Sequence, residues 1–291
     1  MMSDIANTAP RDDDEAGTDS AVAILVPRTS TAEKLLRIAV PVGMLVLGVV
    51  AWHLTVVING IPKYILPTPA DVANSLLNDW PTLLPALWVT LKITFTALAL
   101  ALVGGVAMAI LLVQSKWIEL ALFPYAVILQ VTPIIAIAPL LLIYAPDTQT
   151  ALLICSFLVA FFPILSNMVA GLKSVDHNLL NLYDLYGASR WQTLIYLKIP
   201  AAMPYFMAGL RIGGGLALIA AVVAEFAAGS AGEGSGLAFR LLESQYRLNI
   251  PRLFAALILL TGTGIAIFGL TSFIAWLTLH RWHESAVKRE N

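Results

Sequence analysis

Six long apolar segments constrain this chain more than any other feature of its sequence. A helix needs roughly 20 mostly apolar residues to cross a hydrocarbon core of about 30 Å, because lipid offers no partner to an unsatisfied backbone group. We therefore predict an all-α polytopic membrane protein. Its six transmembrane helices are expected at residues 38–58, 84–113, 120–145, 151–172, 205–224 and 253–279.

Composition agrees with lipid as the solvent and excludes several functions. Only 12% of the residues are charged, whereas soluble domains carry about 25%. The net charge of -1 and the scattered cations give no surface for nucleic acid. Cys155 is the only cysteine, so neither an intrachain disulfide nor a cysteine metal cage is possible.

Catalytic and metal sites are not predicted. His280 and His283 stand at i and i+3, but no further ligands join them, so we favour interfacial anchoring by Arg281 and Trp282. The glycine-rich stretch 232–236 lacks the strand and helix of a phosphate loop, and we interpret it as a turn. No Walker sequence occurs, so any ATPase must be another chain.

The two ends of the chain are predicted to lie outside the membrane domain. Residues 1–34 include the acidic run Asp12 to Glu15 and are expected to form a disordered tail. The first apolar run begins only after Arg37, so it should remain as an anchor instead of being cleaved. The transmembrane domain is expected to occupy residues 35–283, followed by a short tail at residues 284–291.

Prolines and glycines within the spans indicate a packed bundle. Pro133, Pro139 and Pro163 should kink their helices, which requires protein neighbours. Gly209 and Gly213 form a small-xxx-small pair that allows close helix approach. Five polar residues are candidates for a translocation path, and the uncharged ones suit interhelical contacts equally well: Gln130, Thr132, Ser166, Asn167 and, near the start of the fifth span, Arg211.

The distribution of Lys and Arg predicts the orientation, since cytoplasmic loops hold an excess of these residues. With six spans, both termini lie on one side. Twelve of the 17 Lys and Arg residues then share the side of the termini, against five on the other: Lys63, Lys92, Arg240, Arg247 and Arg252. Both termini are therefore expected in the cytoplasm.

The loop between the fourth and fifth spans is long enough to have structure of its own. In residues 178–186, the positions Leu179, Leu182, Tyr183 and Tyr186 repeat as one face of a short helix that Gly187 ends. A second turn should begin at Ser189-Arg190-Trp191 and stop at Pro200. Exposed Tyr and Trp side chains suit a protein partner.

This loop resembles the coupling motif of bacterial ABC importer permeases, which reads roughly E-A-A-x-x-x-G-A before an apolar segment ending in Leu-Pro or Ile-Pro. Further matches are Leu-Pro-x-Pro at 66–69, Gln-Val-Thr-Pro at 130–133, Phe-Phe-Pro at 161–163, Gly-Leu-Arg at 209–211 and the acid Glu225. The resemblance is closest to the nitrate, sulfonate and taurine group. It implies a coupling role for Asn181, Leu182, Tyr183, Tyr186, Gly187, Ala188, Ser189, Arg190, Trp191 and Pro200.

The resemblance implies the permease subunit of an ATP-driven importer in the bacterial inner membrane, with a cytoplasmic coupling helix between spans four and five. Such a subunit moves a small solute, similar to nitrate, sulfonates or taurine or a vitamin precursor, by alternating access. The implied partners are cytoplasmic ATPase subunits that hold ATP and Mg, an extracytoplasmic substrate-binding protein, a second copy of the chain, and lipid. The alternative is a secondary transporter or channel that works without ATP.

Reporter fusions test this topology. A reporter after Asn291 or within residues 174–190 should register as cytoplasmic, and one near Pro69 or Ser244 as external. The physical reason is the excess of cations on the side of the termini. The reverse pattern would contradict the coupling role together with the topology, because ATPases are cytoplasmic.

Overall fold

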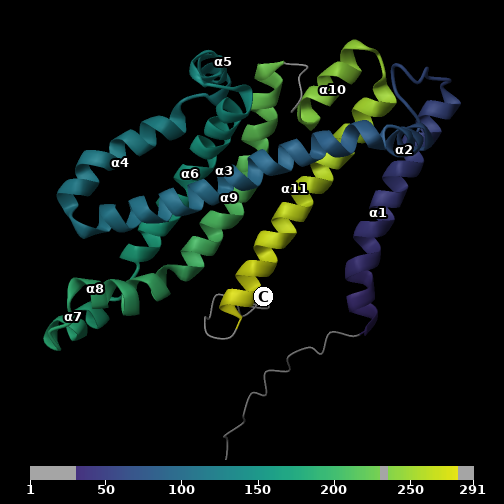
Figure 1. Ribbon diagram of the computed structural model, residues 1–291. Coiled ribbons are helices and arrows are strands. Elements are labelled where there is room, and N and C mark those ends of the chain that lie inside the picture. Colours follow the sequence, from purple (N-terminus) through teal and green to yellow (C-terminus); the bar gives the residue numbers. More distant parts are fainter. Residues whose placement is uncertain (1–30, 230–234, 281–291) are drawn as a thin grey trace, which may run out of the picture. The chain divides into compact units, whose positions relative to one another are not determined.

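The computed structural model describes residues 31–229 and 235–280, and these fall into two compact units (Figure 1). The first unit ends at Ala51, within helix α1 (Thr31–Ile58), and the second begins at Trp52. Helix α1 starts a few residues before the predicted first span. The predicted tails, Arg281 to His283 and most of the glycine-rich turn at 232–236 lie outside the described residues.

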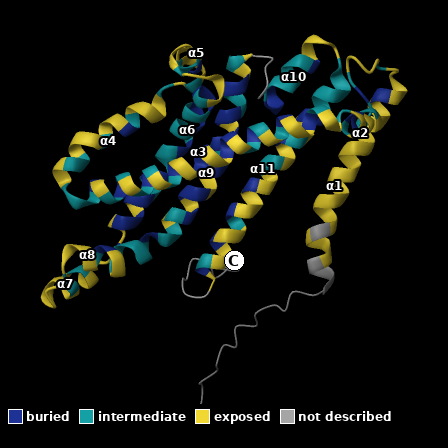
Figure 2. Ribbon diagram, in the orientation of Figure 1, coloured by how far each residue is buried: buried dark blue, intermediate teal, exposed yellow. Residues whose placement is uncertain are grey.

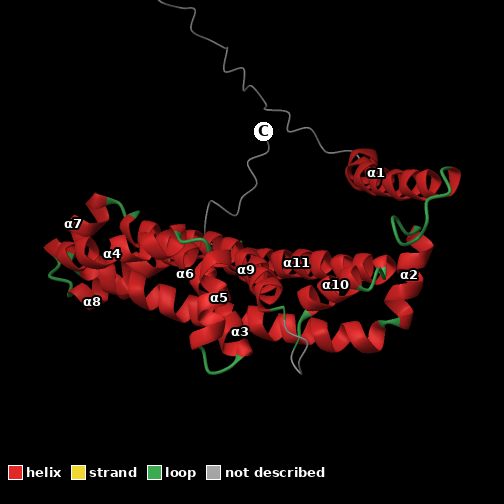
Figure 3. Ribbon diagram, turned by 90° about the horizontal axis from the view of Figure 1, so that it is seen from above, coloured by secondary structure: helices red, strands yellow, loops and turns green. Residues whose placement is uncertain are grey.

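The second unit is built from helices, and no strand occurs in the part of the chain that the structure describes (Figure 3). In chain order its elements are α2 (Pro69–Asn78), α3 (Trp80–Gln114), α4 (Lys116–Val131), α5 (Ile134–Tyr144), α6 (Thr148–Lys173), α7 (His177–Leu185), α8 (Arg190–Thr193), the π-helical turn η1 (Leu194–Lys198), α9 (Ile199–Ala228), α10 (Leu237–Tyr246) and α11 (Ile250–Leu279).

The helices account for the predicted spans, with one correction. Within the described residues, five helical stretches are long and apolar enough to cross a membrane, and a sixth span results if α4 and α5 are taken together. These two helices meet at an angle of 98°, so the predicted third span is broken and not merely kinked. Pro133 stands at this break, where it has no N–H to continue the helix. The chain is thus an all-α polytopic membrane protein.

Pro200 does not stop the helix before the fifth span, contrary to our prediction. The helical stretch runs without interruption from Arg190 to Ala228. Its turn at Leu194–Lys198 is widened to π-helical geometry, and the Ile199 N–H donates to the Leu194 carbonyl. A π-helical turn is a known way of inserting an irregularity without ending a helix. The 39 residues amount to roughly 58 Å measured along the helix, at 1.5 Å per residue.

Helices α6 and α9 form the centre of the second unit, and buried residues line both of them (Figure 2). Glycines permit this contact. A Cβ atom on Gly213 would lie 2.9 Å from the Ile164 side chain, and one on Gly209 would lie 3.2 Å from the Pro163 carbonyl oxygen. The close approach predicted for this glycine pair is confirmed. The tightest of these contacts is at Gly171, where a Cβ would lie 2.8 Å from the Cβ of Tyr205 and 2.9 Å from the Cα of Ala202.

Substitution of Gly171 by Ala tests this packing. Replacing a helical Gly by Ala usually stabilises a protein by about 0.5–1 kcal/mol, but overpacking against backbone costs about 1–3 kcal/mol. We expect the overpacking to dominate, so Gly171→Ala should lower the melting temperature of the purified protein.

The matched control is Gly104→Ala on α3, where the new Cβ would meet only Phe side chains at 3.6 Å and beyond. This variant should melt at the wild-type temperature or above it. Equal melting temperatures for the two variants would contradict the proposed close contact between α6 and α9.

Candidate functional site

The segment from α7 to η1 has the local structure that its sequence predicts. The Asp176 side chain caps α7 by accepting from the Asn178 N–H at 2.9 Å. Gly187 follows α7 with a φ of +67°, a left-handed conformation that favours glycine. Ser189 then begins α8 through a reciprocal capping box with Gln192. The predicted break at Gly187 and the new start at Ser189 are confirmed.

Large apolar side chains of this segment are exposed. Tyr186 is 82% exposed and Trp191 is 66% exposed, and Leu182, Leu185 and Tyr196 are exposed as well. Leu194, by contrast, is buried in a core cluster that contains Leu112 of α3 and Leu172 of α6. We call the exposed set Leu182, Leu185, Tyr186, Trp191 and Tyr196 the coupling surface. The predicted outward position of Tyr183 is only partly correct, because this side chain is half-buried.

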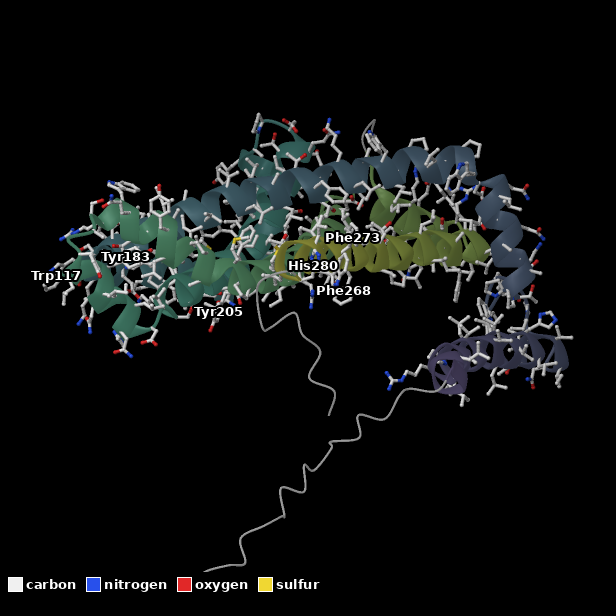
Figure 4. The ribbon with its side chains drawn as sticks, turned by 90° about the horizontal axis from the view of Figure 1, so that it is seen from below. Trp117, Tyr183, Tyr205, Phe268, Phe273 and His280 are labelled. Carbon is white, nitrogen blue, oxygen red and sulfur yellow. The ribbon has the colours of Figure 1, made fainter. Side chains whose placement is uncertain are left out.

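Two cavities lie beside the coupling surface. One, of about 270 Å³, is lined by Asp184, Ala188 and Arg190 together with the end of α3. The other, of about 500 Å³, is lined by Lys116 and the ends of α3 and α6. Trp117 and Tyr183 lie at this same end of the second unit (Figure 4). An ion pair of 2.6 Å between Lys173 and Glu119 joins α6 to α4 there.

The five candidates for the translocation path lie in three places. Gln130 and Thr132 stand at the break between α4 and α5, where the Thr132 hydroxyl donates to the Ile128 carbonyl at 2.6 Å. On α6, Ser166 and Asn167 both donate to the Pro163 carbonyl, at 3.3 Å and 2.7 Å. Thr132, Ser166 and Asn167 therefore donate these hydrogen bonds to backbone carbonyls of their own segments.

Arg211 lies on α9, with its guanidinium carbon 5.6 Å from the centre of the Phe268 ring of α11. The helix extends further toward the N-terminus than the predicted span, because α9 begins at Ile199 and the helical stretch at Arg190. The guanidinium over an aromatic face is a cation–π arrangement. This contact links α9 to α11.

A buried polar cluster joins α3, α9 and α10, and the sequence reasoning did not find it as a site. Glu225 is 2% exposed, and its carboxylate accepts from the Thr90 hydroxyl at 2.8 Å and from the Ala238 N–H at 2.9 Å. The Thr90 oxygen in turn accepts from the Leu237 N–H at 2.9 Å. The acid Glu225 within an apolar span could have indicated a functional site, whereas a single threonine such as Thr90 gives no such indication.

Ion pairs lie on α10 and between its neighbouring helices. Arg252 of α11 pairs with Asp79 between α2 and α3. Glu243 pairs with both Arg240 and Arg247, at 2.8 Å and 2.9 Å. The hydrogen bond from Arg252 lowers the pKa of Asp79 below its ordinary value, and the hydrogen bond from Arg240 does the same for Glu243. Both acids therefore contribute stability above their ordinary pKa values and lose it only as the pH falls through the lowered ones.

Residues that suit metal binding do not gather in the described part of the chain, where no group of three or more His, Cys, Asp or Glu side chains is found. His280 stacks on Trp276 with ring centres 4.5 Å apart. Its companion in the metal alternative, His283, lies outside the described residues. The interfacial anchoring predicted for Arg281 and Trp282 lies outside them too.

Comparison with known proteins adds independent findings. Residues 101–282 match the family model described as "Binding-protein-dependent transport system inner membrane component". A "Probable ABC transporter permease protein" of Haemophilus influenzae is 31% identical over 82% of this chain and 95% of its own length. The "Riboflavin transport system permease protein RibX" of Chloroflexus aurantiacus is 32% identical, over 85% of this chain and 91% of its own.

Other similar chains bear the names of permeases for formylaminopyrimidine, nitrate and taurine. A solved structure titled "Crystal structure of an amino acid ABC transporter with histidines" superimposes with a TM-score of 0.58 at 20% identity. It covers 71% of this chain and 97% of its own. At this identity the likeness concerns the fold alone.

Proposed function

The chain belongs to the family of binding-protein-dependent transport system inner membrane components, and we propose how its geometry serves the permease subunit of an ATP-driven importer. The permease is a non-catalytic transport subunit, so a separate ATPase chain must supply the driving reaction. We assign ATP and Mg to that chain. The coupling surface is proposed as the place where the ATPase docks.

The exposure of the coupling surface carries this proposal. Tyr and Trp dominate docking energetics because they bury large areas at little entropic cost. Tyr186 and Trp191 flank the left-handed Gly187, so the turn at this glycine sets the direction of both. Ala188 and Arg190 line the cavity behind them, while Asn181 is exposed on α7. Pro200 lies just past the π-helical turn, in the helical stretch Arg190–Ala228 that carries Trp191 of the coupling surface. We call this stretch the helical rod.

The proposed orientation places the coupling surface and both termini in the cytoplasm of a bacterial cell. Cations near this end of the second unit support it, since Lys116, Lys173, Arg190 and Lys198 all line the two cavities. Helix α10 then lies on the external side, where an extracytoplasmic substrate-binding protein delivers the solute. Lipid surrounds the apolar outer faces of the helices.

The proposed solute is small, and names among the relatives supply the classes to test. They are riboflavin and a pyrimidine, which are vitamin-related heterocycles, the anion nitrate, and the zwitterionic sulfonate taurine. Residues at the α4–α5 break, Gln130 and Thr132, are proposed to line the path. Ser166, Asn167 and Arg211 are the further candidates, because polar groups within apolar spans usually face a cavity or another helix.

The permease is expected to work as a homodimer, because a symmetric pair is the commonest closed oligomer and two ATPase chains need two docking surfaces. The mass of the purified complete transporter checks this. Two copies of this chain and two ATPase chains are the expected content. One copy, or an obligatory pairing with a different permease, would contradict it.

Substitution of Gly187 by Val tests the coupling surface. A β-branched residue with this left-handed φ costs about 1–2 kcal/mol, so the turn should rearrange and misplace Tyr186 and Trp191. Uptake should collapse, binding-protein-stimulated ATP hydrolysis should fall, and the ATPase should co-purify poorly. Uptake is measured with labelled riboflavin, formylaminopyrimidine, nitrate and taurine, and the solute that the wild type carries is then used for the variant.

The matched control is Gly60→Val, since Gly60 also has a left-handed φ, of +57°, and open space around it. It carries the same backbone cost in a loop remote in sequence from the coupling surface. Its transport should stay near the wild-type rate. A Gly187→Val chain that is inserted normally, retains its ATPase and transports like the control would refute the coupling role.

A further inference from the structure

We propose that Glu225 is a positioning residue that locks α10 to the end of α9, so that binding-protein stimulation of the ATPase depends on its carboxylate. The inference rests on the proposed function of the coupling surface. It concerns the link between the external α10 and the cytoplasmic end of the same helical rod. The link consists of the Glu225 carboxylate, the Thr90 hydroxyl and the first amides of α10.

Helix α10 begins without a cap of its own. Its N-cap is Gly236, which has no side chain to accept from the first N–H groups. These groups carry the positive end of the helix dipole and need acceptors when they are buried. Thr90 accepts from the N–H of Leu237 and Glu225 accepts from the N–H of Ala238. Two other helices therefore supply the cap of α10.

The geometry of this cap admits little variation. One carboxylate oxygen of Glu225 accepts from the Thr90 hydroxyl, and the other accepts from the Ala238 N–H. The Thr90 hydroxyl has one proton and its 2.8 Å contact with the carboxylate is shorter than its 3.3 Å contact with the Ala86 carbonyl. A Cβ atom at Gly236 would lie 2.0 Å from a Glu225 oxygen, so the backbone there is pressed against the carboxylate. A carboxyl group buried this deeply needs such hydrogen-bond partners.

The position of Glu225 near the end of α9 connects the cap of α10 to the coupling surface. The uninterrupted helical stretch starts at Arg190 beside the coupling surface and ends at Ala228, one turn beyond Glu225 (Figure 1). A displacement of the α8 end is therefore carried by one helix to the cap of α10. The apolar core under α10, with Leu237 packed among Val72, Leu83 and Ala255, keeps α10 folded in place. The carboxylate adds the connection to α9.

The variant Glu225→Gln replaces the carboxylate by an amide of nearly the same shape. It therefore separates the contribution of the carboxylate from that of the apolar packing under α10. In Glu225→Gln one amide oxygen still accepts from Ala238, but the amide nitrogen is a donor and cannot accept the Thr90 proton. Thr90 must then turn its proton to the more distant Ala86 carbonyl, and the strong hydrogen bond that it donates to the carboxylate is lost. The apolar packing of α10 is unchanged. The helix should therefore stay in place with a weakened link to α9.

The experiment uses the complete transporter in liposomes, with its ATPase and binding protein, and compares ATP hydrolysis with and without the binding protein. For Glu225→Gln the basal rate should stay within about twofold of wild type, while stimulation by the binding protein should fall at least about fivefold, the lower end of usual coupling. A merely structural defect would lower both rates together. The control is Asp147→Asn, an exposed N-cap of α6 where Asn caps equally well.

A second pair of variants tests the same link if the Glu225→Gln transporter does not assemble. Thr90→Ser keeps the hydroxyl and should retain stimulation, whereas Thr90→Val removes it at nearly equal volume and should lose stimulation. Equal stimulation in these two variants, or wild-type stimulation in assembled Glu225→Gln, overturns the inference while leaving the importer assignment intact. A wild-type transporter that binds no ATPase overturns the proposed function instead.

Discussion

The close approach of α6 to α9 is the contact on which the rest of the structure depends. In lipid there is no hydrophobic force between helices, so association relies on packing and hydrogen bonds, and small residues let two backbones meet. Gly171 and Ala202 provide this contact next to the loop that joins the two helices. The distance between the end of α6 and the start of α9, where the segment that carries the coupling surface is attached, is therefore fixed. A movement of that surface then reaches both helices.

Prolines in this fold have effects that their surroundings decide. Pro133 separates α4 from α5 because no widened turn compensates for its missing donor. Pro200 sits behind a π-helical turn and leaves the rod intact. Pro163 lies inside α6, where Ser166 and Asn167 bind its carbonyl. A broken helix is also found in secondary transporters, but the family match places this chain among binding-protein-dependent permeases.

Local patterns predicted those features that depend on local physics. The apolar runs gave the spans, Gly187 gave the end of α7, and Ser189 gave the start of α8. The continuation through Pro200 was missed because a π-helical turn has no sequence signature. The cap of α10 was missed because Thr90 and Glu225 are 135 residues apart and meet only through tertiary packing. The path candidates were chosen for their polarity alone. Polarity did not indicate that Thr132, Ser166 and Asn167 donate hydrogen bonds to the backbone of their own segments.

Docking of an ATPase on the coupling surface is tested most directly by site-specific photo-crosslinking in membranes that contain the complete transporter. A photoreactive residue replaces Tyr186 on the coupling surface or, in a second protein, the equally exposed Tyr246 on α10. Adducts are identified by mass spectrometry. We expect an adduct with the ATPase chain from position 186 and none from position 246. An ATPase adduct at position 246, or none at position 186 in an assembled transporter, would contradict it.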